Sequence, residues 1–395
     1  MSREYSVVDL FGAPGGLSLG FKMSGYFKIL ACVDNDPVAA ATYAYNLNEA
    51  KVITSEIQKA YAFLYEIKKN WGEIDVVMGG PPCPGFSVVG RVKIASLART
   101  GKWNHLKNTH PKFIDDPRND LYKYFVRVVK KLRPKFFVME NVFGMVSHGG
   151  GETVKRVLKD FARIGYATEW RVLNAANYGV PQKRKRIFFV GNRLGLPNPF
   201  PAPTHSLSAE NSDEGSGLKK TPTVWDAIGD LPRLHAGEGE EMAPYDRNPF
   251  TDYQRWARSG SRYVFNHVAR PHSERDLRLF RHMREGMRWA ELPLRLRMMY
   301  GYRDDVFRDR MKRLHRNKPA WTITAHLAKD GYAYIHPTQD RTITVREAAR
   351  LQSFPDTFIF YGPLTAQFKQ VGNAVPPLLA MAVGNEIGKV LESIT

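Results

Sequence analysis

Short apolar runs alternate with longer amphipathic stretches through the first half of the chain. Runs rich in β-branched and aromatic residues predict five strands, at residues 5–10, 27–33, 74–78, 135–139 and 187–190. Between them, helical spacing of apolar residues predicts helices at 37–48, 56–69, 121–132 and 152–164. Continuous apolar strands separated by helices are typical of a parallel sheet that is buried on both faces. We therefore expect a Rossmann-like α/β fold with a doubly wound, mostly parallel sheet, whose functional loops follow the carboxyl ends of the strands.

The pattern changes after Gly191, because residues 195–217 are rich in Pro, Ser and Gly and predict a linker. A predicted helix at 376–391 is apolar on one face, so we expect it to return to the first domain. The expected organisation is a catalytic, cofactor-binding domain at 1–194, a smaller domain at 195–365 that begins with the linker, and a C-terminal segment at 366–395.

The composition of the chain excludes several classes of protein. Among the 395 residues, no apolar run approaches the ~20 residues of a membrane helix, and the first residues lack the apolar core of a signal peptide. Cys32 and Cys83 are the only cysteines, which excludes a disulfide scaffold and a Cys-rich zinc module. We expect a soluble, cytoplasmic protein without a metal site.

The net charge of +19, from 58 Lys and Arg against 39 Asp and Glu, suggests a polyanionic partner. Much of the excess positive charge lies in residues 251–320, which contain eighteen Lys and Arg but only eight Asp and Glu, with aromatic residues between them. This stretch is either a helical module with solvated basic faces or a surface that follows nucleic-acid phosphates.

Polar residues and glycines gather at the ends of the first two predicted strands. The first strand runs into a loop that contains Gly15 and Gly16, which lets the backbone approach a nucleotide-like ligand. The spacing of its glycines differs from the dinucleotide fingerprint, which disfavours a dehydrogenase. After the second strand, we expect Asp34 to hold ribose hydroxyls and Asp36 to cap the helix that begins at Pro37.

The later strands end at residues suited to catalysis. Cys83 lies in a turn bounded by Pro and Gly, as expected of an exposed nucleophile, whereas Cys32 lies within an apolar strand and is expected in the core. Residues 84–114 contain six Lys and Arg and no acid, which predicts a basic functional loop. Glu140 can donate or accept a proton, or it is a helix cap or part of a solvated ion pair.

The basic run at 182–186 enters the last predicted strand. Since strand residues alternate between faces, Arg184 and Arg186 should share one face and Lys183 and Lys185 the other. Two arginines on one side at the ligand edge would suit a base or a phosphate, although a solvated charge run is the common alternative.

Six ordered segments resemble the motifs of the S-adenosylmethionine-dependent DNA cytosine-5 methyltransferases of the restriction-modification type. They are Asp9 to Phe11 with Gly15 and Gly16, Gly80 to Cys83, Glu140 to Val142, Gln182 to Arg186, Arg346 to Pro355, and Gln370 to Pro376. The sequence departs from the family pattern at Ala13, which replaces a glycine, at Pro84, which replaces a glutamine, and at Glu56, which replaces an aspartate.

The resemblance implies a role for each matching residue. Cys83 would be the nucleophile that adds to carbon 6 of a cytosine extruded from duplex DNA, Glu140 would contact the ring nitrogen and amine, and Arg184 and Arg186 would lie near the extruded base. The implied cofactor residues are Phe11, Gly15, Gly16, Asp34, Asn35, Glu56, Ile57, Pro82, Leu121, Asn373 and Ala374. DNA contacts are expected from Ser87, Arg91, Lys93 and the stretch 251–320, which corresponds to the target-recognition region.

Other functions remain as alternatives. An RNA cytosine-5 methyltransferase is the nearest, but the Cys-Phe-Thr tripeptide of the related transfer-RNA enzymes is absent, since Val33 follows Cys32 and Pro84 follows Cys83. A catalytically silent DNA-binding module would lack the nucleophile or the acid, and both are present. As an enzyme acting on DNA, the chain is expected to be a monomer associated with the nucleoid, and any cognate restriction endonuclease would be a functional but not a physical partner.

Overall fold

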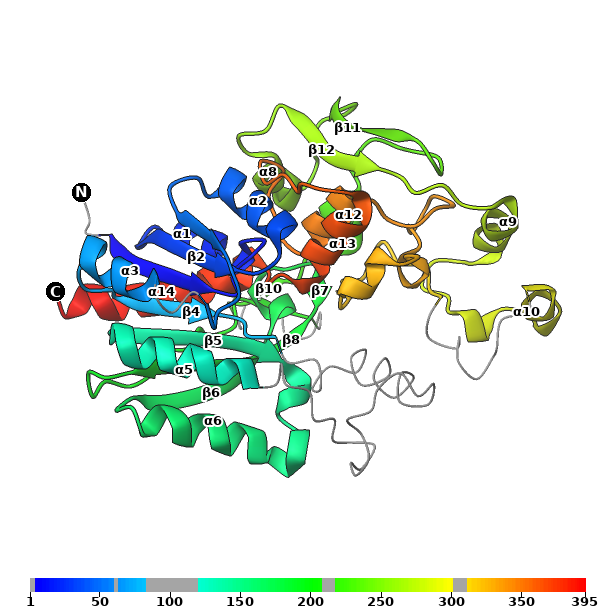
Figure 1. The fold of residues 1–395 in the computed structure, drawn as a ribbon. Coiled ribbons are helices and arrows are strands. Elements are labelled where there is room, and N and C mark those ends of the chain that lie inside the picture. The colour runs from blue at the N-terminus through cyan, green and yellow to red at the C-terminus, as the bar shows by residue number, and fades with distance from the viewer. Residues whose placement is uncertain (1–3, 60–62, 83–119, 208–216, 301–310) are drawn as a thin grey trace. The chain divides into compact units, whose positions relative to one another are not determined.

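The computed structural model describes residues 4–59, 63–82, 120–207, 217–300 and 311–395, which form two compact units (Figure 1). The first unit comprises Met1–Asn174, Lys185–Ala202 and Leu379–Thr395, and the second comprises Ala175–Arg184 and Pro203–Leu378. These limits differ from the boundaries expected at residues 194 and 365. The segment Ala175–Arg184 belongs to the second unit because its strand β7 (Gln182–Lys183) pairs with β13 (Ala320–Trp321).

A seven-stranded sheet of order β3-β2-β1-β4-β5-β8-β6 forms the centre of the first unit. Its strands are β1 (Tyr5–Leu10), β2 (Phe27–Asp34), β3 (Lys51–Thr54), β4 (Val76–Gly79), β5 (Phe136–Val142), β6 (Ala167–Asn174) and β8 (Lys185–Asn192). Neighbours from β3 to β5 are parallel, and β8 runs antiparallel to both β5 and β6. The mostly parallel α/β sheet expected from the sequence is confirmed.

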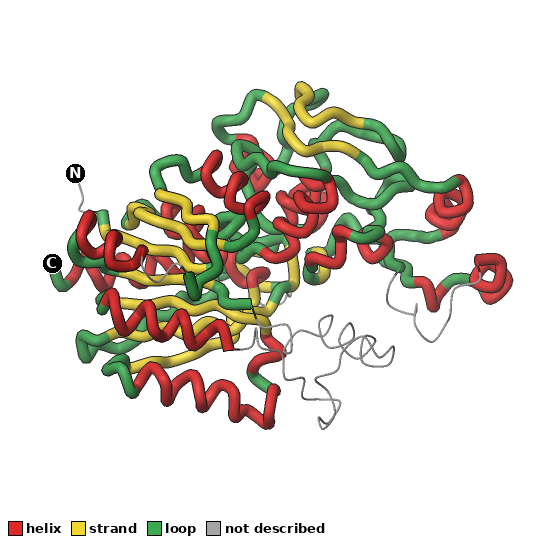
Figure 2. Tube along the Cα trace, in the orientation of Figure 1, coloured by secondary structure: helices red, strands yellow, loops and turns green. Residues whose placement is uncertain are grey.

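Helices cover the sheet of the first unit (Figure 2). They are α1 (Gly16–Met23), α2 (Pro37–Asn46), α3 (Phe63–Trp71), α5 (Leu121–Leu132), α6 (Glu152–Ala162) and the greater part of α14 (Pro377–Ser393). One apolar core joins α3, α5 and α6 to the sheet. The C-terminal helix returns to this unit, where a Cβ atom at Gly384 would lie 3.4 Å from the Phe21 ring and the hydroxyls of Tyr5 and Thr395 are 3.2 Å apart.

Helix α5 shows how the sequence specifies one of these elements. Six apolar or aromatic side chains recur at helical spacing and are buried, among them Phe125 and Val129. Lys130 and Lys131 lie in the last turn, where cations favour the carbonyl end of the helix dipole. The helix ends at Arg133, which adopts the left-handed conformation, and Pro134 follows.

Several predicted elements have other bounds. Strands β3 and β6 were not predicted, because β3 has four residues and β6 is largely exposed and lacks a continuous apolar run. In the region predicted as a helix at 56–69, α3 is described from Phe63 to Trp71, and residues 60–62 lie outside the described residues. Strand β5 extends through Val142, so Glu140 lies inside the strand, because pairing with the antiparallel β8 continues to Arg186.

The second unit combines short helices with small sheets. Its helices are α7 (Val224–Ile228), α8 (Asp252–Arg258), α9 (Glu274–His282), α10 (Leu294–Tyr300), α12 (Val345–Leu351) and α13 (Leu364–Asn373), and its remaining strands are β9 (His205–Ser206), β10 (Lys219–Lys220), β11 (Gly239–Pro244) and β12 (Tyr263–Val268). Strands β11 and β12 pair antiparallel, with α8 between them in the sequence. Within the described ranges of both units, no helix is long and apolar enough to cross a membrane.

Candidate active site

The backbone holds the loop after β1 in a tight conformation. Phe11 has a φ of 59°, and its N–H donates to the carbonyl of Val33 at 2.7 Å. Gly15 has a φ of 115°, which favours glycine, and immediately precedes α1, whose first residue is Gly16. Three of the predicted cofactor residues therefore belong to one short loop at the carboxyl end of β1.

Asp9 lies in β1 beside this loop, and its side chain is fully buried. The Ser18 hydroxyl donates to Oδ2 of Asp9 at 2.6 Å, and the Tyr43 hydroxyl donates to Ser18 at 2.6 Å. A Cβ atom at Gly12 would lie 2.4 Å from Cγ of Asp9, so only glycine lets the loop pass over this carboxyl group. Burial raises the pKa of Asp9 to about 7, opposed by the Ser18 hydrogen bond and assisted by Asp34.

The second strand ends at a carboxylate that is tied to the same loop. Asp34 accepts hydrogen bonds from the N–H groups of Ala13 at 3.1 Å and Asp36 at 2.9 Å. Burial raises the pKa of Asp34 despite these bonds. Asp36 accepts from two N–H groups in the first turn of α2, so its predicted capping role is confirmed. Asn35, between the two acids, is exposed.

The other predicted cofactor residues divide between the units. Glu56 and Ile57 follow β3, Pro82 follows β4, and Leu121 begins α5. Because β3, β2, β1 and β4 are consecutive parallel neighbours, the loops that follow them lie along one edge of the sheet. Asn373 and Ala374 lie at the end of α13 in the second unit, so their contact with a cofactor stays a prediction.

Glu140 forms an ion pair with Arg186 at the neighbouring strands β5 and β8. Its Oε1 lies 2.9 Å from Nε of Arg186, and the two side chains are only 12% and 13% exposed. Burial lowers the pKa of Arg186, while the charge of Glu140 acts in the opposite direction. The pair is thus largely shielded from water, which strengthens its electrostatic interaction.

The loop that leads from β4 toward Cys83 runs beside this carboxylate. A Cβ atom at Gly80 would lie 3.1 Å from Oε2 of Glu140, and the side chain of Asn141 donates to the carbonyl of Pro81 at 3.0 Å. No role was predicted for Asn141 from the sequence, although its place directly after Glu140 was a signal. Asn141 ties the strand that carries the acid to the segment that carries the predicted nucleophile.

Arg184 has different surroundings from Arg186. Lys183 and Lys185 are exposed, whereas the two arginines are buried or nearly so, as predicted from the alternation of strand residues between two faces. The strand itself is interrupted at Arg184, because β7 ends at Lys183 and β8 begins at Lys185. The Arg184 guanidinium donates to the backbone carbonyls of Ile323, Gly372 and Ala374, all in the second unit. In this structure Arg184 therefore joins segments of the second unit, and its place near a base stays a prediction.

The predicted nucleophile and three predicted DNA contacts lie outside the described residues. These are Cys83, Ser87, Arg91 and Lys93. Cys32 is a free, fully buried thiol in β2, and burial raises its pKa well above the ordinary value. It is therefore a core residue, as expected. Within the part of the chain that the structure describes, no group of three or more His, Cys, Asp and Glu side chains is placed to bind a metal ion.

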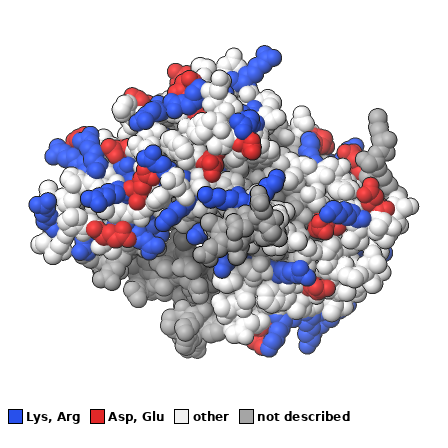
Figure 3. All heavy atoms as spheres, turned by 180° about the vertical axis from the view of Figure 1, so that it is seen from behind, with Lys and Arg blue, Asp and Glu red and all other residues white. Residues whose placement is uncertain are grey.

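The aromatic residues of the basic stretch are mainly structural. Phe280, Trp289 and Tyr300 are buried in one apolar cluster of the second unit, so their interleaving with arginines reflects core packing. Many of the charged side chains are exposed, and on the face drawn in Figure 3 the basic groups are interspersed with acidic ones. The role of 251–320 in binding phosphates stays a prediction.

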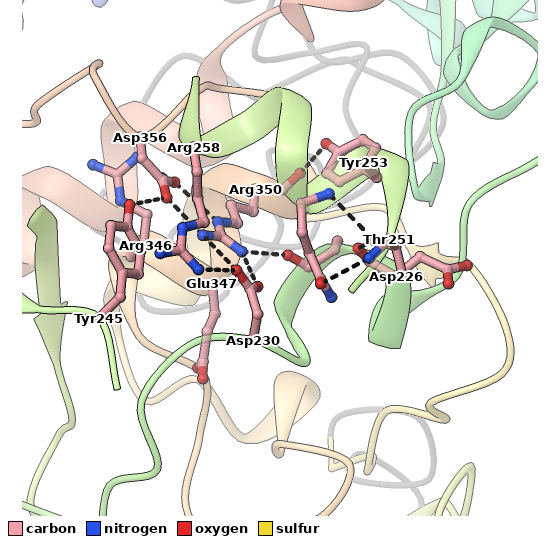
Figure 4. Close-up of polar contacts among 12 residues, drawn as sticks. Asp226, Asp230, Tyr245, Thr251, Tyr253, Arg258, Arg346, Glu347, Arg350 and Asp356 are labelled. Atoms are coloured by element: carbon pink, nitrogen blue, oxygen red, sulfur yellow. Dashed lines mark hydrogen bonds and ion pairs between the residues drawn. The ribbon is translucent and has the colours of Figure 1, made fainter. Parts of the chain in front are cut away.

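A buried ionic network organises the second unit around α12 (Figure 4). Arg350 donates to Asp356 at 2.6 and 2.9 Å and also binds Asp230, and all three side chains are fully buried. Arg346 donates to the carbonyls of Phe265 and Phe358 at 2.8 and 2.7 Å. Two arginines of the motif Arg346 to Pro355 therefore hold the unit together from within.

A second buried group lies at the start of α12. Arg341 donates to both carboxylate oxygens of Glu347 at 2.7 and 2.8 Å, and His336 is 3.5 Å from the same carboxylate. Burial alone would raise the pKa of Glu347, but Arg341 outweighs it and holds the pKa well below its usual range. Burial lowers the pKa of His336 to about 3, so this imidazole is neutral at physiological pH.

Comparison with known proteins agrees with this geometry. Residues 5–389 match the family of C-5 cytosine-specific DNA methylases. The type II methyltransferase M1.HphI of Haemophilus parahaemolyticus is 37% identical over 99% of this chain and 88% of its own length. M.DdeI of Desulfomicrobium norvegicum, also a type II methyltransferase, is 36% identical over 98% of this chain and 90% of its own length.

The fold is also shared with a solved structure. A prophage-encoded protein of E. coli, described as a DNA modification methyltransferase, has a TM-score of 0.73 and 25% identity, with 98% of this chain and 99% of that chain covered. The match over almost the whole sequence, together with the sheet order and the Glu140–Arg186 pair, assigns the family. This chain belongs to the C-5 cytosine-specific DNA methylases, the DNA (cytosine-5)-methyltransferases.

Proposed function

We propose that this protein transfers a methyl group from S-adenosylmethionine to carbon 5 of a cytosine in duplex DNA, by way of a covalent adduct with Cys83. The observation that carries the proposal is the shielded Glu140–Arg186 pair beside the segment that leads to Cys83, where a Cβ atom at Gly80 would lie 3.1 Å from Oε2 of Glu140. An acid and a cysteine at the ends of adjacent strands are the two groups that this reaction requires.

The loops along the sheet edge fit the proposed cofactor. A Cβ atom at Gly12 would overlap the carboxyl group of Asp9, so glycine at this position lets the loop after β1 pack closely on the end of the strand, and this loop would receive the cofactor. Phe11, Gly15 and Gly16 would border the cofactor, Asp34 would accept from the ribose hydroxyls, and Asn35 and Ile57 would border the adenine. S-adenosylmethionine, when bound, supplies an electrophilic methyl group on a sulfonium.

The residues of the site would carry out the steps on the base. Carbon 5 of cytosine is a poor nucleophile, and addition of the Cys83 thiolate at carbon 6 would make carbon 5 electron-rich. Glu140 would hold the ring nitrogen and the amine while charge accumulates there, and Arg186 would keep the carboxylate in place. Once carbon 5 has taken the methyl group, with S-adenosylhomocysteine as the other product, loss of the proton from carbon 5 to a base and expulsion of the Cys83 thiolate would restore the aromatic ring.

The reaction also requires access to the base. A cytosine stacked within a duplex is out of reach of Cys83, so we propose that it is flipped out, at a cost of a few kcal/mol of unstacking. The basic residues at 84–114 and 251–320 would neutralise phosphates around it. A monomeric protein that acts on cytoplasmic DNA, with any cognate endonuclease acting separately, is consistent with this function.

Bisulfite sequencing of plasmid from a host that expresses the chain tests the proposal directly, because it reports activity, substrate and site together. We expect methylated cytosines within one short sequence context. The Cys83→Ala variant should leave the plasmid unmodified and should form no covalent adduct with duplexes that contain 5-fluorocytosine. Unmodified plasmid from the folded wild-type protein, or methylation by Cys83→Ala, would overturn the proposal.

A further inference from the structure

Helix α10 presents apolar side chains to solvent on one face. Leu294, Met298 and Met299 are 57%, 73% and 74% exposed, the last two being the most exposed large apolar side chains of the described residues. On the other face, Leu296 and Tyr300 pack into the apolar cluster of the second unit. The helix is thus anchored by one face, and its exposed face has the composition of a contact surface.

Arg295 lies on the same face as the exposed methionines. Residues four positions apart are neighbours on a helix, so Leu294 lies next to Met298 and Arg295 next to Met299. The exposed face therefore combines one cation with three large apolar side chains. Arg297 is engaged differently, since its Nε donates to the carbonyl of Leu292 at 3.1 Å.

Charge and size indicate which occupant this face fits. The stretch 251–320 has eighteen Lys and Arg against eight acids, so a second copy of this region would be repelled, whereas a polyanion would be attracted. A helix of seven residues is about 10 Å long and, with its side chains, 10–12 Å wide, which matches a DNA major groove about 12 Å wide. Apolar side chains in that groove contact thymine methyl groups, and methionine adapts its shape readily.

We propose that α10 enters the major groove of duplex DNA, where Met298 and Met299 contact base edges and Arg295 contacts a phosphate. This inference rests on the proposed function and deepens it, because it assigns part of the target-site discrimination to one helix. In this stretch the basic residues and the aromatic residues among them were the predicted DNA contacts, and no role was predicted for these methionines.

The test uses the full-length double variant Met298→Gln, Met299→Gln. We expect its Kd for a duplex that carries the methylation site found by bisulfite sequencing to rise at least tenfold, with little change for a duplex without the site. Met242→Gln is the matched control, because Met242 is 53% exposed in the same unit but lies in β11 beside Glu240 and Glu241.

A second variant separates the phosphate contact from the base contacts. Arg295→Gln should weaken binding to both duplexes alike and reduce the slope of log Kd against log salt by about one. Circular dichroism establishes that each variant is folded, as expected for changes on an exposed face.

Two results would overturn the assignment of α10. One is an unchanged Kd and methylation pattern in the double variant, and the other is self-association of the wild type that this variant abolishes, which would make the face a dimer contact. Wild-type activity is measured first, so loss of that activity refutes the proposed function, whereas an active wild type with an unaffected double variant refutes only the role of α10.

Discussion

Replacement of Asp9 by asparagine should change how stability depends on pH. The carboxyl group is fully buried beneath the loop that follows β1 and accepts from the hydroxyl of Ser18, and burial raises its pKa from 3.8 to about 7. Asparagine keeps the shape and an acceptor oxygen but has no proton to lose in this range. The difference between the two proteins therefore isolates the cost of burying the charged carboxylate.

The magnitude follows from the difference in pKa. A shift of about three units, at 1.36 kcal/mol per unit, corresponds to about 4 kcal/mol. Between pH 4 and 7 the folded protein retains a proton on Asp9 that the unfolded chain has lost. The stability that this protonated carboxyl group gives the folded protein is therefore fully present below pH 4 and is lost as the pH rises through 7. Relative to the wild type, the free energy of unfolding of Asp9→Asn should therefore increase by up to this amount as the pH rises from 4 to 8.

Urea unfolding of both proteins at pH 5, 6, 7 and 8 measures this difference. Since the second unit is identical in both, its own pH dependence cancels when the unfolding free energies are subtracted. Asp120→Asn is the matched control in the first unit, because the carboxylate of Asp120 is 57% exposed. Parallel stability curves for wild type and Asp9→Asn across this range would refute the argument that Asp9 is buried as an uncharged acid.

Three further changes test other parts of the structure. Arg350→Met leaves two buried carboxylates without their shared cation, so it should destabilise the second unit by about 3–5 kcal/mol, measured by thermal unfolding. The pKa of His336 lies near 3, below its ordinary value of 6.5, so the stability that the buried neutral imidazole contributes is present above pH 6.5 and is lost as the pH falls toward 3. Limited proteolysis at pH 4–5 should therefore cleave the second unit first. Gly12→Ala should raise the Kd for S-adenosylmethionine at least tenfold in calorimetry, because its Cβ atom would overlap the carboxyl group beneath the loop.

The central sheet was predictable because its strands are continuous apolar runs. Strand β1 has the predicted bounds, and β2 differs by one residue at its end. Strand β6 escaped prediction because edge strands face solvent and do not need an apolar pattern, and the interior of its sequence alternates charged and aromatic residues. The end of β5 depended on the length of its antiparallel partner, which no local pattern encodes.

The site was predictable to the extent that it follows from topology. Because parallel strands end at one edge, the placement of Asp34 at the end of β2 and of Glu140 near the end of β5 along that same edge follows from the strand assignments. The different partners of Arg184 and Arg186 did not follow, since the carbonyls that bind Arg184 lie more than 130 residues away in the sequence. The exposure of Met298 and Met299 likewise depends on which face of α10 the core occupies.

The chain passes from the second unit to the first between Arg184 and Lys185, and the two arginines mark this crossing. Arg184 is bound by carbonyls of the second unit, whereas Arg186 is bound by a carboxylate of the first. All the contacts described for Glu140, to Arg186 and beside Gly80, lie within the first unit. These contacts hold the carboxylate from within the first unit. Two arginines of one short motif therefore serve different units, since Arg184 joins segments of the second and Arg186 holds the acid of the first.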